Sequence, residues 1–148
     1  PDAPKLSSKT YSPRKLYDER VVTTGDIPLE LSAGALLLDA RSTERFRGDV
    51  EPIDPVTGHV PGARNLPFTE IVGADGRLLP TEQLRERLEQ ALDGKSASTV
   101  VTMCGSGITA CHLSLGFAAA GLPEGRIYAG SWSEWIRDNG REIAVGDD

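Results

Sequence analysis

The chain has 148 residues, a length that fits one domain with a single hydrophobic core. Hydrophobic residues make up 39% and charged residues 26% of the sequence, which indicates a globular chain rather than a disordered one. The net charge of −6 argues against a nucleic-acid surface, and two cysteines are too few for a disulfide framework. We therefore expect a cytoplasmic protein, and the sequence has no apolar run long enough for a membrane span.

The first part of the chain divides into a polar segment and the start of a folded domain. Residues 1–20 are polar and contain several prolines, so we expect a linker or N-terminal arm before a domain over residues 21–148. A short strand is expected at residues 21–23, followed by a helical turn at residues 26–33. The apolar run at residues 35–40 predicts a strand buried on both faces of a parallel sheet.

Strand and helix patterns alternate through the rest of the chain. They predict further strands at residues 99–103 and 126–129, with helices at residues 42–46, 81–92, 108–120 and 132–139. The expected fold is therefore an α/β domain of three layers, with a mostly parallel central sheet and helices on both faces. Ligands of such sheets bind beyond the carboxyl ends of the strands.

One of these strand ends carries a cysteine. Cys104 follows the strand at residues 99–103, and a loop with Gly105 and Gly107 leads into the next helix. The glycines permit a tight curve with inward N–H groups, and the helix N-terminus adds unpaired donors, so a negative charge on a thiolate or persulfide would be stabilised. The alternative is that Cys104 is a small buried residue. Cys111, inside the apolar helix, is expected to be an inert core residue.

Four motifs, in order, resemble the rhodanese superfamily and, within it, the C-terminal catalytic domain of the 3-mercaptopyruvate sulfurtransferases. They are LLDAR at residues 37–41, GHVPGA at 58–63, CGSGITA at 104–110 and GSWSEW at 130–135. The resemblance implies a rhodanese-like fold and a sulfurtransferase that moves sulfane sulfur from 3-mercaptopyruvate to a thiol or cyanide through a Cys104 persulfide. It implies an acceptor thiol such as thioredoxin and an inactive rhodanese domain on the N-terminal side. We expect no cofactor, and no metal site because two cysteines and two scattered histidines lack metal-ligand spacing.

The resemblance also assigns roles to residues. It implies catalytic roles for Cys104, Ser106 and Thr109, and a cradle for the persulfide made by Gly105, Gly107 and Ile108. Arg45 is the expected substrate-binding arginine, and Asp39 and Arg41 are the expected scaffold of the cysteine loop. Thr109 could instead bond its own helix backbone, and Arg45 could be a solvated residue of a short helix. We expect His59 to bond backbone in a turn, and Trp132 and Trp135 to pack in the core.

The loop after the cysteine bears on the donor. Gly105 and Ser106 are uncharged, as in mercaptopyruvate-type enzymes, whereas thiosulfate-type rhodaneses carry cations there. Residues 48–58 contain no arginine, although mercaptopyruvate enzymes often have a second substrate arginine in this region. A thiosulfate sulfurtransferase, a non-catalytic rhodanese module and a sulfur-relay protein therefore remain alternatives. A phosphatase of the same fold would need an arginine where Ala110 stands.

Overall fold

The computed structural model describes residues 18–147, and within them five strands form one sheet. The strands lie in the order β1-β5-β4-β2-β3, and all four neighbouring pairs are parallel. Their bounds are β1 Val21–Val22, β2 Leu36–Asp39, β3 Arg64–Asn65, β4 Val100–Met103 and β5 Arg126–Tyr128. The alternating pattern therefore predicted the α/β class correctly, and the central strands β2, β4 and β5 lie close to their predicted positions.

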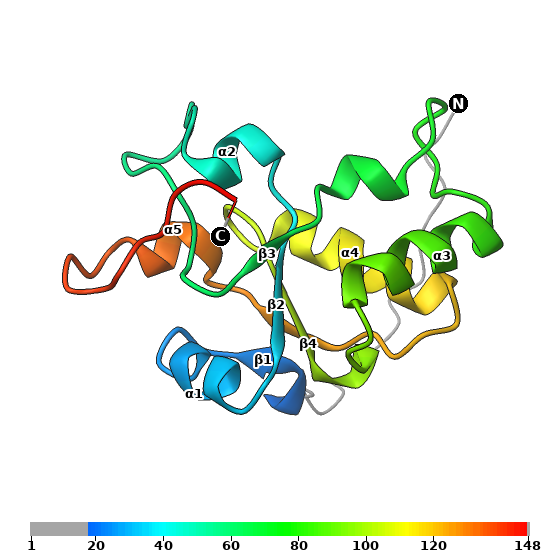
Figure 1. Ribbon diagram of the computed structural model, residues 1–148, viewed down its shortest axis with the longest axis horizontal. Helices are drawn as coiled ribbons and strands as arrows, with labels where there is room; N and C mark the ends of the chain where they lie inside the picture. Colours follow the sequence, from blue (N-terminus) through cyan, green and yellow to red (C-terminus); the bar gives the residue numbers. More distant parts are fainter. Residues whose placement is uncertain (1–17, 148) are drawn as a thin grey trace, which may run out of the picture.

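The helices cover both faces of this sheet. Figure 1 shows α1, α2 and α5 on one side and α3 and α4 on the other, which gives the three expected layers. The α-helices are α1 Ile27–Ser32, α2 Thr43–Arg47, α3 Thr81–Leu92, α4 Ile108–Ala119 and α5 Ser131–Trp135. Three short 3-10 helices complete the described residues: η1 Asp18–Arg20, η2 Phe68–Ile71 and η3 Ala97–Thr99.

The central strands are apolar because both of their faces are covered. Leu36 and Leu38 pack into the core cluster beneath α3 and α4, whereas Leu37 points into the cluster that holds Trp132 and Trp135. Successive strand residues alternate between faces, so a strand with a helix layer on each side needs apolar residues at consecutive positions. Each fully buried leucine contributes about 2 kcal/mol. Both tryptophans are core residues, as predicted.

The last helix is shorter than its predicted range of residues 132–139. The helix α5 ends at Trp135, and Arg141 donates from Nη1 to the carbonyl oxygens of Trp135, at 2.9 Å, and of Glu134, at 3.3 Å. The indole N–H of Trp135 in turn donates to the carbonyl of Glu142 at 3.0 Å. A side chain from the following segment thus satisfies carbonyl groups that another helical turn would have used.

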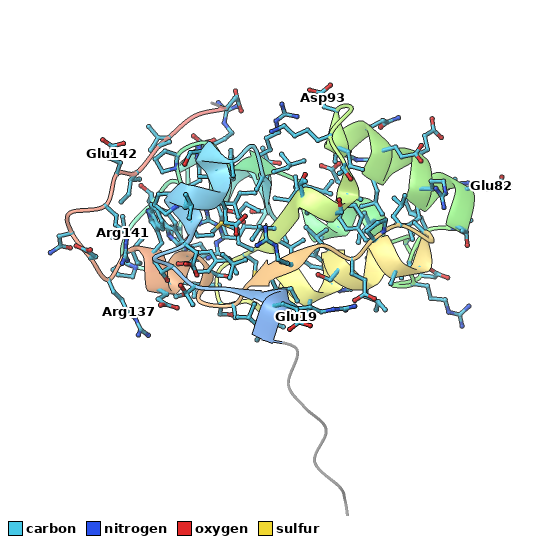
Figure 2. All side chains as sticks on the ribbon, turned by 90° about the horizontal axis from the view of Figure 1, so that it is seen from below. Glu19, Glu82, Asp93, Arg137, Arg141 and Glu142 are labelled. Atoms are coloured by element: carbon cyan, nitrogen blue, oxygen red, sulfur yellow. The ribbon has the colours of Figure 1, made fainter. Side chains whose placement is uncertain are left out.

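Several charged side chains lie at the periphery of these layers. Figure 2 shows Glu82 and Asp93, at the two ends of α3, pointing away from the layers, and Arg137 and Glu142 doing the same at the opposite end of the molecule. Within residues 18–147, no helix combines the length and the apolar character that crossing a membrane requires. The predicted linker falls outside the described residues apart from residues 18–20, so the domain boundary stays a prediction.

Candidate active site

Cys104 lies directly after β4, where the sheet gives way to the loop that leads into α4. Its residue surface is only 2% exposed. The loop turns at Gly107, whose φ of +84° is unfavourable for any residue with a Cβ. A Cβ there would also lie 2.6 Å from the carbonyl oxygen of Ala129, so the close approach of the two segments requires glycine at this position.

The segment after β5 holds the backbone of the cysteine. Ser131 accepts a hydrogen bond from the Cys104 N–H at its Oγ, at 3.1 Å, and donates to the carbonyl of Tyr128 at 2.9 Å. The N–H of Trp132 donates to the Cys104 carbonyl at 3.0 Å, and the N–H of Ser133 donates to the Gly105 carbonyl at 2.9 Å. Ser131 adopts a φ of +53°, which costs a non-glycine residue about 1 kcal/mol. The backbone of Cys104 is therefore held through both its N–H group and its carbonyl oxygen.

The first turn of α4 supplies donors beside Cys104. The N–H of Cys111 donates to the Gly107 carbonyl at 3.4 Å, which is the first hydrogen bond of the helix. The N–H groups of Ile108 and Thr109 precede it and have no intrahelical acceptor. Such a helix start favours negative charge, which is the property that a thiolate or persulfide needs.

A pocket of about 260 Å³ opens at this loop. It brings together Cys104 with most of the residues predicted from the sequence, namely Arg45, Gly105, Ser106, Ile108 and Thr109. Three further residues line it: Ile53, Asp54 and Ser133. Gly107 is buried and shapes the loop from behind. The pocket thus combines a cysteine, the hydroxyl groups of Ser106, Thr109 and Ser133, a guanidinium and a carboxylate.

Arg45 of α2 reaches the pocket with its charge already paired. Its Nε lies 2.9 and 3.0 Å from the two carboxylate oxygens of Glu51, and its Nη2 lies 3.2 Å from Oδ2 of Asp54. Burial acts to raise the pKa of the Glu51 carboxyl, but hydrogen bonds from Arg45 and the N–H groups of Asp54 and Ile53, with the Arg45 charge, lower it below its ordinary value. Glu51 is therefore an ionised partner of Arg45.

Asp39 and Arg41, the predicted scaffold, are both buried. Arg41 donates from Nε and Nη2 to the Asp39 carboxylate at 2.9 and 2.6 Å, and from Nη2 to the Gly58 carbonyl at 2.8 Å. It also lies 3.5 Å from Glu51 and stacks over Trp132, 4.8 Å from the ring centroid. Within residues 18–147, these side-chain contacts run to the loop at residues 48–58 and to α5, so direct support of the cysteine loop stays a prediction.

Both histidines and the second cysteine lie outside the pocket lining. His59 is buried, stacks on Phe46 with a ring-centroid distance of 3.7 Å, and bonds the Phe46 carbonyl through Nδ1 at 2.8 Å, as a turn histidine should. His112 packs against Phe68 at 5.6 Å. The prediction that Cys111 is a core residue is wrong, because it is exposed on α4 and its Sγ faces the Gly107 carbonyl at 3.4 Å.

Sequence reasoning missed the part that residues 48–58 and α5 play in the site. In the sequence, Glu51 and Asp54 belong to residues 48–58, which stand out only because they contain no arginine, and Ser133 is one position of the GSWSEW motif. Ser133 donates its hydroxyl to Asp54 at 2.9 Å or to the Gly105 carbonyl at 2.7 Å. The available signal was the presence of two carboxylates a few residues after a conspicuous arginine, where an ion pair is a reasonable expectation.

The fold and this cysteine loop define a class of protein. The family model described as the rhodanese-like domain matches residues 26–138, and the chain therefore belongs to the rhodanese-like domain family. This match confirms the fold and the family that the four motifs predicted.

Particular relatives share more of the sequence. A Pseudomonas aeruginosa protein named a probable 3-mercaptopyruvate sulfurtransferase is 55% identical over 77% of this chain and 40% of its own length. A Mycobacterium tuberculosis protein, provisionally named a thiosulfate sulfurtransferase, is 40% identical over 97% of this chain and 50% of its own. Human 3-mercaptopyruvate sulfurtransferase is 43% identical over 67% of this chain and 34% of its own. The chain thus spans about half or less of these relatives.

Solved structures show the same fold. The Tum1 protein of Saccharomyces cerevisiae superposes with a TM-score of 0.74 and 29% identity, covering 88% of this chain and 48% of that one. The 3-mercaptopyruvate sulfurtransferase of Leishmania major gives a TM-score of 0.67 and 34% identity, covering 80% of this chain and 33% of that one. In both cases the match again covers about half or less of the other chain.

Proposed function

We propose that this domain is a sulfurtransferase that moves sulfane sulfur from 3-mercaptopyruvate to a thiol or cyanide acceptor through a persulfide on Cys104. The observation that carries the proposal is the placement of Cys104 at the start of an uncharged loop, in a pocket that also holds Arg45. A cysteine whose backbone is held on both sides, beside the donors of a helix start, is well suited to act as a nucleophile.

The proposed reaction has two half-reactions. In the first, the Cys104 thiolate attacks the sulfur of 3-mercaptopyruvate, an S–S bond forms, and the C–S bond breaks. The electron pair of that bond leaves with the carbon as the enolate of pyruvate, which gains a proton to become pyruvate. In the second, an acceptor thiolate or cyanide attacks the outer sulfur of the persulfide, and Cys104 leaves as the thiolate. No external oxidant is needed, because the sulfur atom leaves its C–S bonding pair on the pyruvate carbon in the first half-reaction and its S–S bonding pair on Cys104 in the second.

The residues around Cys104 have distinct proposed roles. The hydroxyl groups of Ser106 and Thr109 line the pocket and could deliver the proton that the departing enolate needs. The backbone of Gly105, Gly107 and Ile108 forms the cradle for the persulfide anion. We assign Arg45 to the carboxylate of the donor, since a guanidinium fork matches a planar carboxylate.

The choice of donor is open to a direct alternative. Thiosulfate is a smaller dianion, and the Mycobacterium tuberculosis relative, which matches nearly the whole chain, carries a thiosulfate sulfurtransferase name. The uncharged residues Gly105 and Ser106 support mercaptopyruvate, because a dianion lodged at Cys104 would gain more from cations in the loop. We therefore place 3-mercaptopyruvate first and thiosulfate second.

The test is to incubate the purified chain with each donor and measure the mass of the peptide that contains Cys104. A gain of one sulfur atom with 3-mercaptopyruvate, exceeding the gain with thiosulfate, is the expected result. The variant Cys104→Ser should show no gain, whereas the matched control Cys111→Ser should behave as the parent chain. A larger gain with thiosulfate would reverse the donor assignment, and no gain with either donor would favour a non-catalytic module.

Further parts of the proposal concern the whole protein. The relatives are about twice as long as this chain or longer, which supports an additional domain, and the resemblance to two-domain sulfurtransferases favours an inactive rhodanese domain on the N-terminal side. The acceptor in this proposal is a protein thiol such as thioredoxin, in the cytoplasm. If the persulfide forms but passes only to a specific partner, the chain is a sulfur-relay protein, and partner capture with and without persulfide separates the two cases.

A further inference from the structure

The pocket beside Cys104 contains an imbalance of charge. In the described part of the chain, Arg45 and Asp54 are its two charged lining residues, and they contact each other at 3.2 Å. The same guanidinium also pairs with Glu51, since Nη2 of Arg45 lies 2.7 Å from Oε1 of Glu51. One cation thus faces two carboxylates, and an incoming anion meets an arginine whose Nε and Nη2 already contact carboxylates.

The two carboxylates differ in their exposure to the pocket. The Glu51 side chain is only 1% exposed and is committed to Arg41, Arg45 and the N–H groups of Ile53 and Asp54. The Asp54 side chain is 9% exposed and lines the pocket itself. Glu51 therefore builds the site, whereas Asp54 is the carboxylate that a bound donor would face.

Asp54 also has a second partner that does not depend on Arg45. The hydroxyl of Ser133 lies 2.9 Å from its Oδ1, and Ser133 is tied to the cysteine loop because its N–H donates to the Gly105 carbonyl. The same hydroxyl also lies 2.7 Å from the Gly105 carbonyl, so its single hydrogen can turn to the Asp54 carboxylate when the contact with Arg45 is released. This makes the exchange of one carboxylate for another at Arg45 feasible, since the Asp54 carboxylate keeps a hydrogen-bond donor and the Arg45 guanidinium keeps an anionic partner.

We propose that Asp54 sets the charge selectivity of the Cys104 pocket: an anionic donor approaches Arg45 against the potential of the Asp54 carboxylate and takes Nη2 of Arg45 by displacing it. The penalty rises with the charge of the donor, because the potential of Asp54 acts on each negative charge, so the pocket selects against dianions more strongly than against monoanions. Ile53, the exposed lining residue beside Asp54, adds no cation to offset it. This inference rests on the proposed function for its biological meaning, but its electrostatic content can be measured separately.

The test uses the two cysteines of the same chain. Iodoacetate is an anion and iodoacetamide is neutral. The rate of alkylation of Cys104 by iodoacetate, divided by its rate with iodoacetamide, reports the electrostatic potential of the pocket without any sulfur transfer. In Asp54→Asn this ratio should rise about tenfold. The exposed Cys111 gives an internal reference whose ratio should not change. The control Asp49→Asn removes an equal charge at an exposed site that pairs with Arg47, and it should leave the Cys104 ratio unchanged.

Two results would overturn the inference. An unchanged ratio would mean that Asp54 exerts no control, and a lower ratio would mean that Asp54 chiefly holds Arg45 in place for anions. If Asp54→Asn does not fold, Asp54→Ser removes the same charge and is judged by the same ratio.

Donor kinetics then link the two proposals. In Asp54→Asn, kcat/KM should rise more for thiosulfate than for 3-mercaptopyruvate, and a rise that is equal for both donors would count against charge selectivity. Absence of persulfide in the parent chain with any donor would defeat the proposed function, while the alkylation ratio would still decide the role of Asp54. A persulfide that forms normally, together with an unchanged ratio, would defeat only the role of Asp54.

Discussion

Ser131 combines a strained backbone with two buried hydrogen bonds, and the two effects can be separated by substitution. Its φ of +53° favours glycine, and its hydroxyl serves the Cys104 N–H and the Tyr128 carbonyl. In Ser131→Ala the strain remains and the buried N–H loses its acceptor, which should lower the free energy of unfolding by about 2 kcal/mol. In Ser131→Gly the same bonds are lost, but relief of the strain returns about 1 kcal/mol.

The expected order of stability is therefore parent chain, then Ser131→Gly, then Ser131→Ala. Urea denaturation followed by the fluorescence of the buried Trp132 and Trp135 measures it. Ser133 is the matched control, because it lies in α5 at a position without positive φ, where glycine should be less stable than alanine by up to about 1 kcal/mol. An alanine variant more stable than the glycine variant at position 131 would refute the reasoning.

Three further predictions concern stability. Gly107→Ala places a Cβ 2.6 Å from the Ala129 carbonyl at positive φ and should cost at least about 2 kcal/mol by urea denaturation, whereas Gly105→Ala should cost much less, since its nearest neighbour is an Arg45 nitrogen at 3.4 Å. Burial raises the pKa of Tyr128 to about 12, so as the pH rises this side chain ionises first in the unfolded chain. The free energy of unfolding should therefore fall by about 1.4 kcal/mol per pH unit between pH 10 and 12, and in Tyr128→Phe this added slope should vanish. The pKa of Glu51 is lowered in the folded chain, so Glu51 contributes to the free energy of unfolding above the ordinary carboxyl pKa of about 4.3, and this contribution is lost as the pH falls through the folded pKa. In Glu51→Gln, acid titration should show a shallower loss of stability. An acid-induced loss identical to that of the parent chain would contradict the pairing.

Much of the fold could be predicted because its signals are local. The helix predicted at residues 81–92 is α3, Thr81–Leu92, and its signal is local because Leu84, Leu88 and Leu92 are spaced to share one face of a helix. The end of α5 could not be predicted, because Arg141 caps it from a later segment. The exposure of Cys111 was missed because α4 is apolar all round, so the sequence does not tell which side faces the sheet.

The site divides in the same way. Cys104 and its loop were found because a strand, two glycines and a helix follow one another in the sequence. The convergence of Arg45, Ser106 and Thr109 on one pocket followed from a family pattern rather than from spacing. The roles of Glu51 and Asp54 could not be predicted, since their loop has no periodicity and its shape depends on the N–H groups of Ile53 and Asp54 closing onto Glu51.

The charged side chains behind the pocket form an alternating series that runs from the sheet to the pocket wall. Asp39, Arg41, Glu51, Arg45 and Asp54 follow one another with separations of 2.6, 3.5, 2.7 and 3.2 Å. Each interior member has an oppositely charged neighbour on both sides, so replacing one removes an ion-pair partner from two others. The effects of two such replacements on the free energy of unfolding will therefore not be additive. As related sequences diverge, these positions should change together, and an isolated charge change within the series should be rare unless another change accompanies it.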